Sequence, residues 1–576
     1  MVSQRTSHCL KAHAAATSHW ESDRSLKIHF VAPTLIGIHE NYQKTETKLD
    51  QTVDYIVVGA GSAGCVVAHR LVKAGHSVLL LEAGPTDRIK FVKMPATFVR
   101  VIGTERSWVY ETTPQPHANG RKMYVPQGRM TGGSSSLNAM VYIRGSAADY
   151  DDWAAAGCTG WGWNDVLPVF KRAESNMRFS GDHHGTDGPL RVSDTKFRHP
   201  LSLAFLKAAQ EAGLPYNDDF NTGCQAGVGF YQTTTVDGTR GSTAATYLAQ
   251  VESDPKLALI NGAHVLRVTI DGGQATGVEY RMPDGTVKKV QARREVVLTA
   301  GALATPKLLQ VSGVGPGALL QRLGIPVKRD LPGVGENFHD HLEIIAHGRC
   351  KEPISLLGQD KGFTALKHGV QWELFKTGLL TSNVVESGGF VDTLGTGRPD
   401  VQFHVLPVVV GDVDRPMPEV HGISIDPCFL RPKSRGRVQA RSADAMDPAV
   451  FDGGFLSEQE DLDTLVRGLK LARRILRMPS MQKVIAEEMY PSPKEDLSDK
   501  ELEQFVRQHA KTVYHPVGTC RMGTDAMSVV DLKLRVHGVG RLRVCDASVM
   551  PSITSGNTNA PTIMIAERAA EFMLAA

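Results

Sequence analysis

The segment 54–64, with the sequence DYIVVGAGSAG, constrains the fold of this chain more than any other feature. Its apolar residues 55–58 are typical of a buried parallel strand, and they lead directly into the glycines Gly59, Gly61 and Gly64. The first glycine permits a tight turn, the second lets a phosphate group approach the backbone, and the third lets the following helix pack against the strand. The pattern therefore predicts a strand, a phosphate-binding turn and a helix.

The residues that follow complete this unit. The apolar residues 65–71 continue as a predicted helix that Gly75 ends, and residues 77–81 form a second predicted strand with Glu82 at its tip. The first N–H groups of the helix would face a phosphate, and the Glu82 carboxylate is placed to accept hydrogen bonds from a ribose 2′-hydroxyl. Strand, helix, second strand and terminal acid in this order indicate a dinucleotide-binding unit.

Length and charge limit the possible functions. The chain has 576 residues, enough for two to four domains, and its 64 basic and 61 acidic residues give a net charge of only +3. No nucleic-acid-binding surface is indicated by this balance. The eight cysteines are scattered without a C-x-x-C pair, which favours reduced thiols and a cytoplasmic location. No apolar run predicts a transmembrane segment, and peripheral membrane association is left open.

Residues 1–51 differ from the rest of the chain. They are polar, contain five histidines, and lack the apolar core and cleavage site of a secretory signal. We expect a disordered extension here, with organelle targeting as the alternative, and we exclude it from the prediction of the fold.

A second glycine-rich loop covers residues 128–138. Arg129 precedes two adjacent glycines, Gly132 and Gly133, and three serines that begin at Ser134. Such a loop can approach an anionic or planar ligand closely, although its local composition alone favours a plain flexible loop. The chain contains no G-x-S-x-G motif in this loop, so a hydrolase nucleophile elbow is not indicated.

Periodicity predicts most of the remaining elements. A helix is expected at 201–212, two strands at 257–270 and 278–281 around the hairpin-type turn Asp271-Gly272-Gly273, and a strand at 295–299 that leads into a helix ending near Gln310.

From residue 342 onward, alternating segments such as 401–405 and 436–441 predict an antiparallel sheet with one solvated face. Helices are expected at 461–476 and 499–509, the second of them started by a capping box of Ser498 and Glu501.

The C-terminal part carries a family resemblance. The segments 514–523 (YHPVGTCRMG), 542–551 (LRVCDASVMP) and 557–559 (NTN) resemble the glucose–methanol–choline (GMC) oxidoreductases, and segments 301–315 and 331–337 agree with that family. The resemblance covers about residues 54–575. Residues 383–386 and 429–436 look most like bacterial sorbose-dehydrogenase-type and choline-dehydrogenase-like FAD alcohol dehydrogenases.

The resemblance implies an α/β fold with two parts. One is a Rossmann-like FAD domain with a parallel sheet, and the other is an α+β substrate domain with an antiparallel sheet covered by helices. The expected division is a disordered extension (1–51), an FAD-binding domain in three parts (52–155, 228–341 and 508–576) and a substrate-binding domain in two parts (156–227 and 342–507).

The implied cofactor is FAD rather than NAD, and the loop 128–138 becomes the family's first signature instead of a plain flexible loop. Thr131 departs from the aliphatic residue that is usual there. Leu137 stands where some relatives carry a flavin-linked histidine, so the resemblance implies FAD that is bound non-covalently.

The resemblance also assigns the site residues. His515 matches the catalytic base, and Asn557 matches a position where relatives place a histidine or an asparagine. Asp546 and Asn559 match residues near the ribityl and pyrimidine end of FAD, and Val265 matches a position whose backbone meets the adenine. The other expected cofactor-binding residues are Gly59, Gly61, Ser62, Gly64, Glu82, Arg129, Gly133, Ser134 and Asn138.

The expected activity is oxidation of an alcohol or polyol to the carbonyl compound. His515 would take the hydroxyl proton, a hydride would pass to flavin N5, and the electrons would go to a quinone, cytochrome or dye. The alternatives are an oxygen-using alcohol oxidase, a lyase or decarboxylase of the same fold, and a redox-inactive flavin scaffold. The sequence does not indicate the oligomeric state.

No metal site is expected, because the histidines and carboxylate of 339–341 lie inside a family loop without a defined ligand geometry. The pair His183 and His184 and the thiol of Cys520 are expected to be structural.

Overall fold

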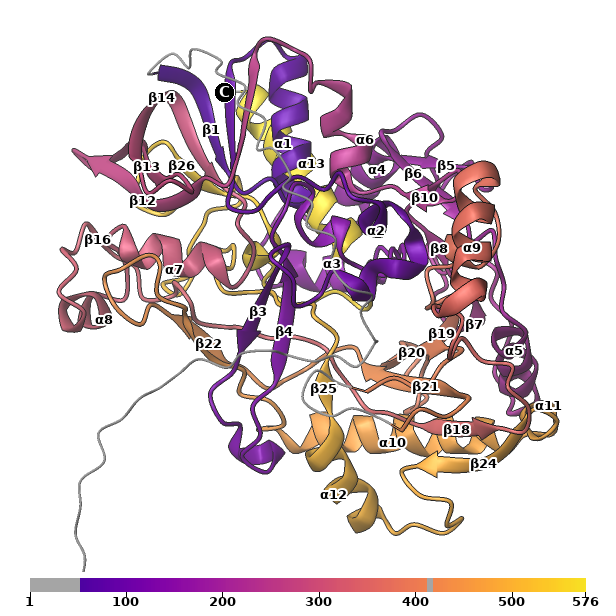
Figure 1. The fold of residues 1–576 in the computed structure, drawn as a ribbon. Helices are drawn as coiled ribbons and strands as arrows, with labels where there is room; N and C mark the ends of the chain where they lie inside the picture. The colour runs from indigo at the N-terminus through magenta and orange to yellow at the C-terminus, as the bar shows by residue number, and fades with distance from the viewer. Residues whose placement is uncertain (1–51, 412–417, 576) are drawn as a thin grey trace, which may run out of the picture. The chain divides into compact units, whose positions relative to one another are not determined.

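The computed structural model describes residues 52–411 and 418–575, and the predicted N-terminal extension lies outside them (Figure 1). The elements of the described part are arranged around two large β-sheets. One sheet contains the dinucleotide-binding motif. The other contains the alternating segments that follow residue 342.

The first sheet has seven strands in the order β11-β2-β1-β14-β13-β12, with β26 paired to β14. The strands that surround the glycine motif are parallel, which confirms the predicted parallel sheet. These parallel strands are β1 (Thr52–Val58), β2 (Val78–Glu82), β11 (Leu257–Asn261), β14 (Val287–Leu298) and β26 (Leu542–Val544).

The predicted hairpin is present, with one difference. β12 (His264–Asp271) and β13 (Gln274–Arg281) are antiparallel and turn at Gly272 and Gly273, whose φ angles are 52° and 75°. The first predicted strand is divided into β11 and β12, because Gly262 has a φ of 76° and breaks the extended chain there. β11 therefore joins the parallel part of the sheet, and β12 joins the hairpin.

Two helices from opposite ends of the chain lie against each other beside this sheet. α1 (Ser62–Lys73) follows the first glycine turn, and α13 (Asn559–Leu574) ends the described chain. The Arg70 guanidinium donates two hydrogen bonds, of 2.9 and 2.8 Å, to the buried carboxylate of Glu567. The C-terminal segment is thereby fixed next to the first glycine turn.

The second sheet has eight strands and is antiparallel, as predicted. Its main order is β24-β18-β21-β20-β19-β7, with β17 and β25 attached beside β21. The strands are β7 (Gly227–Phe230), β17 (Leu342–Glu343), β18 (His347–Cys350), β19 (Ser387–Val391), β20 (Val401–Leu406), β21 (Gly422–Phe429), β24 (Ile485–Tyr490) and β25 (Lys511–Thr512).

The expectation of one solvated face is wrong. Every residue of β21, and every residue of β20 except the last, is buried. The apolar face, with Phe403 and Ile425, packs on α10 (Gln459–Leu476). The alternate residues Gln402 and His404 are polar because they face a buried site instead of solvent. The segment 436–441 is not in this sheet, since β22 (Arg437–Gln439) pairs only with β23 (Val450–Asp452).

The predicted helices agree closely with the structure. α5 (Pro200–Glu211), α7 (Ala304–Val311) and α10 lie where they were expected. α12 (Asp499–His509) begins at Ser498, whose hydroxyl accepts from Glu501 N while Glu501 accepts from Ser498 N, which completes the capping box.

The domain boundaries stay a prediction. Residues 228–230 of β7 and both residues of β25 fall in predicted FAD-domain segments, yet both strands belong to the second sheet. Within 52–411 and 418–575, no helix is both long enough and apolar enough to cross a membrane.

Candidate functional site

The first glycine turn has the geometry that its sequence predicts. Gly59 has a φ of 102°, and a Cβ there would lie 2.7 Å from the carbonyl oxygen of Thr299. A Cβ on Gly64 would lie 1.9 Å from the carbonyl oxygen of Gly59, so only a glycine lets α1 pack against the turn. These two positions are glycine because of the protein's own packing.

Gly61 differs from its two neighbours. A Cβ there would meet no atom closer than 3.8 Å, and its φ does not lie in the left-handed region, so neither packing nor backbone strain requires a glycine. Gly61 precedes α1, whose first N–H groups have no partner within the helix. Such unpaired N–H groups at the start of a helix suit an anionic group such as a pyrophosphate.

The second glycine loop lies directly against the first. Gly133 begins the short helix η3 (Gly133–Ser136) with a φ of 52°, and a Cβ there would lie 2.6 Å from Gly61 Cα. The two loops, far apart in the sequence, therefore lie against each other at Gly61 and Gly133.

Glu82 ends β2 at the same edge of the sheet. Its carboxylate accepts hydrogen bonds from Ala60 N at 3.0 Å and Gly84 N at 2.9 Å, and each oxygen keeps a lone pair. Burial raises the pKa of Glu82 to about 7. Val265, the expected adenine neighbour, lies in β12 and is 9% exposed.

Residues from the end of the chain complete this region. The Ser62 hydroxyl donates to Asn559 Oδ1 at 2.7 Å, which joins two predicted cofactor-binding residues. Asp546 follows β26, and its carboxylate accepts from Gly301 N, from the hydroxyls of Thr305 and Ser548, and from Ser548 N. The Asp546 side chain therefore fixes the Gly301 turn, which leaves mainly its backbone for a ligand.

The other residues of the second loop are held by protein contacts. Arg129 lies over the ring of Trp108, with its Cζ 4.7 Å from the ring centroid, and its buried Nε has no hydrogen-bond partner among the described residues. Ser134 Oγ accepts from Gly128 N, and Asn138 Oδ1 accepts from Met140 N and from Arg240. The buried Leu137 packs with apolar side chains of Val92, Val101 and Met130.

The two predicted catalytic residues meet in space. Asn557 Nδ2 lies 3.3 Å from His515 Nε2, and Asn557 Oδ1 accepts a hydrogen bond of 3.1 Å from Gln402 of β20. Burial lowers the pKa of His515 well below its ordinary value. The side chain is therefore a neutral imidazole at neutral pH, with an amide group facing one of its ring nitrogens.

The residues 339–341 support His515 from the side of the protein. The backbone N–H of His515 donates to Asp340 Oδ1 at 2.8 Å, and His515 Nδ1 lies 3.1 Å from His341 Nδ1. Tyr514 has a φ of 68°, an unusual conformation for a tyrosine. These contacts fix both the backbone and the ring of His515.

Sequence reasoning missed two of these neighbours, Gln402 and His341. Gln402 lies within an ordinary strand pattern, and the sequence around His341 indicates only a family loop. The separations from their partners, 155 residues to Asn557 and 174 residues to His515, leave no local signal in the sequence.

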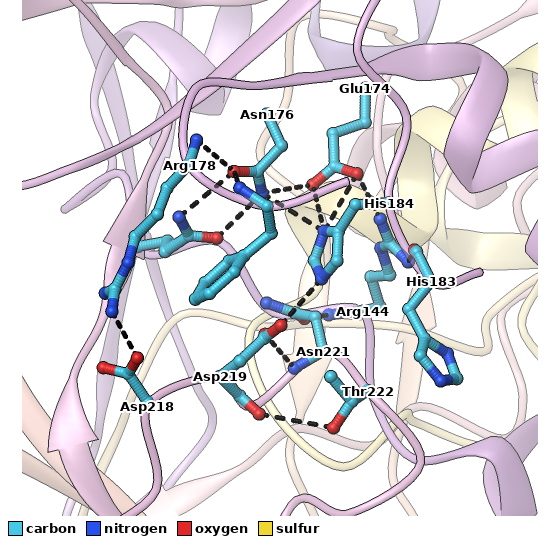
Figure 2. Close-up of polar contacts among 12 residues, drawn as sticks. Arg144, Glu174, Asn176, Arg178, His183, His184, Asp218, Asp219, Asn221 and Thr222 are labelled. Carbon is cyan, nitrogen blue, oxygen red and sulfur yellow. Dashed lines mark hydrogen bonds and ion pairs between the residues drawn. The ribbon is translucent and has the colours of Figure 1, made fainter. Parts of the chain in front are cut away.

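A separate buried network accounts for His184, as predicted. Its imidazole lies 3.1 Å from Glu174 and 2.7 Å from Asp219, and the guanidinium of Arg144 pairs with Glu174 (Figure 2). Each group already has protein partners, so the network is structural. His339 also has protein partners at both ring nitrogens, Asn337 O and Ile553 N. Among the residues that the structure describes, no group of three or more His, Cys, Asp or Glu side chains is placed to hold a metal ion.

Comparison with known proteins agrees with this arrangement. Two family models described as GMC oxidoreductase match residues 53–343 and 432–566. An alcohol dehydrogenase [acceptor] from Pseudomonas putida is 44% identical over 532 residues, which cover 90% of this chain and 95% of the relative.

An oxygen-dependent choline dehydrogenase from Burkholderia vietnamiensis is 44% identical over 526 residues, covering 90% of this chain and 93% of the relative. Among solved structures, pyridoxine 4-oxidase from Mesorbium loti is similar, with a TM-score of 0.82 and 30% identity over 90% of this chain and 98% of that one. The chain thus belongs to the GMC oxidoreductases, FAD-binding enzymes that act on CH–OH groups.

Proposed function

We propose that this protein oxidises an alcohol or polyol to the carbonyl compound, with His515 as the base for the hydroxyl proton. The observation that carries the proposal is the contact between the neutral imidazole of His515 and the amide of Asn557. When bound, FAD supplies a hydride acceptor at N5 of its isoalloxazine ring. The names of the P. putida and B. vietnamiensis relatives support an alcohol as the substrate.

His515 has the properties that a base requires. Its side chain is half-buried and neutral, because desolvation disfavours the imidazolium form. A neutral imidazole can accept the hydroxyl proton as the C–H bond of the alcohol breaks. The hydrogen bond from His515 N to Asp340 fixes the backbone of the base during this step.

Asn557 has a different role, which is to bind the substrate oxygen. Its Oδ1 is occupied by the donor Gln402 Nε2, so its Nδ2 faces the site with two hydrogens. One hydrogen points to His515 Nε2, and the other is left for the substrate oxygen as negative charge develops on it. An amide takes no proton itself, so His515 is the only base in this pair.

We propose that the two glycine loops hold the pyrophosphate of FAD beside Gly61, at the start of α1. Glu82 would accept hydrogen bonds from ribose hydroxyls, and the backbone of Val265 would meet the adenine. Ser62, Asn559 and the backbone of Asp546 would contact the ribityl and pyrimidine end, and Arg129, Gly133, Ser134 and Asn138 would contact the rest of the cofactor. The apolar Leu137 offers no nucleophile to the flavin, so the FAD would be non-covalent.

For the reoxidation step we propose an acceptor other than oxygen, namely a quinone, a cytochrome or a dye. The name of the P. putida relative supports this choice, whereas the names of the choline dehydrogenase and of pyridoxine 4-oxidase make oxygen the alternative. We also propose that the protein is cytoplasmic.

An anaerobic panel of alcohols and polyols tests the proposed reaction. The bound flavin should lose its yellow absorbance with at least one alcohol, and the matching aldehyde or ketone should form in equal amount. Product formation without any change of the flavin oxidation state would instead support the lyase or decarboxylase alternative.

A further inference from the structure

His341 lies between a backbone carbonyl and the ring of His515. Its side chain is fully buried, with Nε2 at 3.0 Å from the carbonyl oxygen of Leu430 and Nδ1 at 3.1 Å from His515 Nδ1. The two rings are nearly perpendicular, at 87°. Nε2 of His341 therefore meets a fixed acceptor and Nδ1 meets the proposed base, and the backbone of Thr554 also lies near the ring.

The carbonyl of Leu430 decides which nitrogen carries hydrogen. A carbonyl oxygen only accepts, so His341 Nε2 must be the N–H. Burial lowers the pKa of His341 to about 3, so the ring is neutral and its Nδ1 is a lone pair. His515 Nδ1 must then be the donor to His341. It follows that His515 Nε2 has no hydrogen and presents a lone pair to the site.

The contacts of Asn557, on the other side of the His515 ring, indicate the same tautomer of His515. Gln402 donates to Asn557 Oδ1, so Asn557 Nδ2 is a donor toward His515 Nε2. A donor at that place requires an acceptor on His515. Every contact from Leu430 to Gln402 is thus satisfied by one arrangement of hydrogens, and the other tautomer of His515 would break two of them.

We propose that His341 is a positioning residue that holds His515 in the tautomer with hydrogen on Nδ1, so that the Nε2 lone pair, which the Asn557 amide contacts in this structure, takes the proton of an alcohol that displaces this contact. When Nε2 accepts that proton, His515 becomes an imidazolium whose Nδ1 hydrogen still points to the His341 lone pair, which stabilises the new charge. The kinetic part of this inference rests on the proposed role of His515 as the base.

Two substitutions separate hydrogen bonding from packing. His341→Leu fills the apolar space but cannot accept from His515 Nδ1, and we expect the rate of flavin reduction at saturating alcohol to fall by about 10- to 100-fold. His341→Asn leaves a smaller side chain, yet its Oδ1 can accept that hydrogen bond, and we expect it to recover most of the rate. A role in packing alone predicts the reverse order, with His341→Leu the better enzyme, and that order would overturn the proposal.

The matched control is His347→Asn. His347 is another fully buried histidine of the second sheet, and neither of its ring nitrogens has a hydrogen-bond partner among the described residues. This variant should keep the parental rate of flavin reduction and the parental dissociation constant for the alcohol.

A measurement on the resting holoenzyme tests the tautomer without any turnover. Long-range 1H–15N spectra of histidine-labelled protein, with the His515 signals identified by their loss in His515→Ala, should show hydrogen on Nδ1 in the parent and in His341→Asn. His341→Leu should show a mixture of tautomers. Hydrogen on Nε2 in the parent would overturn the inference, whereas an active His515→Ala would overturn only the proposed base.

A different observation carries a second inference, about helix α9 (Gly362–Phe375). Phe363, Leu366, Val370 and Leu374 recur at helical spacing, and they are 81%, 61%, 48% and 67% exposed. Together with Phe375 they form the α9 face. Exposed aromatic and leucine side chains in one stripe are unusual on a water-facing surface and mark a contact site.

Basic residues surround the α9 face. Two neighbouring acids are paired, Glu373 with Lys90 at 3.3 Å and Asp360 with Arg100 at 3.0 Å, and a third, Asp87, lies near Lys93. Lys93 and Lys367 are exposed and form no ion pair within the part of the chain that is described. The surface is therefore apolar at its centre with an excess of positive charge around it, which complements an anionic lipid surface.

We infer that the α9 face docks on a membrane that contains anionic phospholipid. The helix beside it, α2 (Lys90–Lys93), reaches the second glycine loop, because Arg240 donates to Val92 O at 2.9 Å and to Asn138 O at 2.7 Å. Docking through this surface would bring the Asn138 loop close to acceptors dissolved in the lipid.

Sedimentation with vesicles tests this docking. The protein should bind phosphatidylcholine vesicles that contain phosphatidylglycerol and should not bind pure phosphatidylcholine vesicles. The double variant Phe363→Ser, Leu374→Ser should bind about tenfold or more weakly, since each buried side chain contributes at least about that factor. Leu203→Ser on α5, at a position that is 44% exposed, is the matched control. No binding, or a dimer in solution that the double variant abolishes, would overturn the inference.

Discussion

Gly133 lies directly against Gly61, so that a Cβ on Gly133 would stand 2.6 Å from Gly61 Cα. The two glycines come from loops that the sequence separates by about seventy residues. Gly133 is a glycine because the other loop occupies its side-chain position. No protein atom occupies the side-chain position of Gly61, so packing does not explain why this residue is a glycine. This difference between the two glycines allows the proposed FAD-binding role of the loops to be tested.

Gly61→Ala should fold normally but bind FAD weakly, because the added methyl meets no protein atom within 3.8 Å and instead occupies the proposed pyrophosphate position. We expect an unchanged melting temperature of the apoprotein and a dissociation constant for FAD raised about tenfold or more, as for loss of a close backbone contact. FAD titration followed by flavin fluorescence measures this constant.

The matched control is Gly369→Ala on α9, where a Cβ would meet no atom within 4 Å. This variant should bind FAD like the parent. If Gly61→Ala also kept the parental affinity, the pyrophosphate would not bind beside Gly61.

Much of the fold follows from the sequence, because local signals determine it. The strand-glycine-helix unit, the hairpin turn at Gly272 and Gly273, and the capped start of α12 at Ser498 all depend on residues within a few positions of each other. The burial of β20 does not depend on such nearby residues. Its alternating pattern would be the same whether its polar residues faced solvent or, like Gln402, the buried catalytic region.

The candidate site was predictable only in part for the same reason. His515 and Asn557 belong to a family motif near the C-terminus, and the structure brings them together. His341 contacts His515 from 174 residues away, and no spacing in the sequence encodes that contact. This contact between His341 and His515 results from the pairing of strands in the second sheet and from the position of Asp340.

The pH dependence of the reaction should reflect the buried state of His515. The neutral imidazole is the reactive form, and burial lowers its pKa well below 6.5. The value of kcat/KM should therefore stay constant as pH decreases from 8 toward about 6.5 and fall only below that, where pH passes through the lowered pKa. An acid limb centred at or above pH 6.5 in the parent would contradict this account of His515.

The buried network of Figure 2 should make stability depend on pH. Burial alone would lower the pKa of His184, but its hydrogen bonds to Asp219 and Glu174 outweigh burial and raise the pKa above 6.5. The stabilisation is complete below pH 6.5 and is lost as pH rises through the raised pKa. The melting temperature of the parent should therefore decrease between pH 6.5 and 9 more than that of His184→Asn.

The exposed His117 provides the control, since His117→Asn should show the parental pH dependence. In the same network, Arg144→Met leaves the buried Glu174 without its guanidinium, and the free energy of unfolding should fall by about 3–5 kcal/mol. Equal pH dependence of the parent and His184→Asn would mean that His184 is not charged in the folded protein.

The electron acceptor can be identified by comparing two rates at one alcohol concentration. We expect alcohol-dependent reduction of a phenazine or quinone dye to exceed peroxide formation in air by about tenfold or more, since the acceptor is chosen by the surroundings of the flavin. Peroxide formed in equal amount and at the same rate as dye reduction would make the protein an oxidase. The roles of His515 and Asn557 would be the same in both cases.

The most direct test of the account is the rate of anaerobic flavin reduction by alcohol in His515→Ala, measured by stopped flow beside the parent and Asn557→Ala. His515→Ala should retain bound FAD and lose about 10²- to 10⁴-fold in this rate, the usual contribution of a general base. Asn557→Ala should lose less, because it removes one hydrogen bond to the substrate oxygen and keeps the base. Flavin reduction at the parental rate in His515→Ala would contradict the assignment of the base and with it the proposed mechanism.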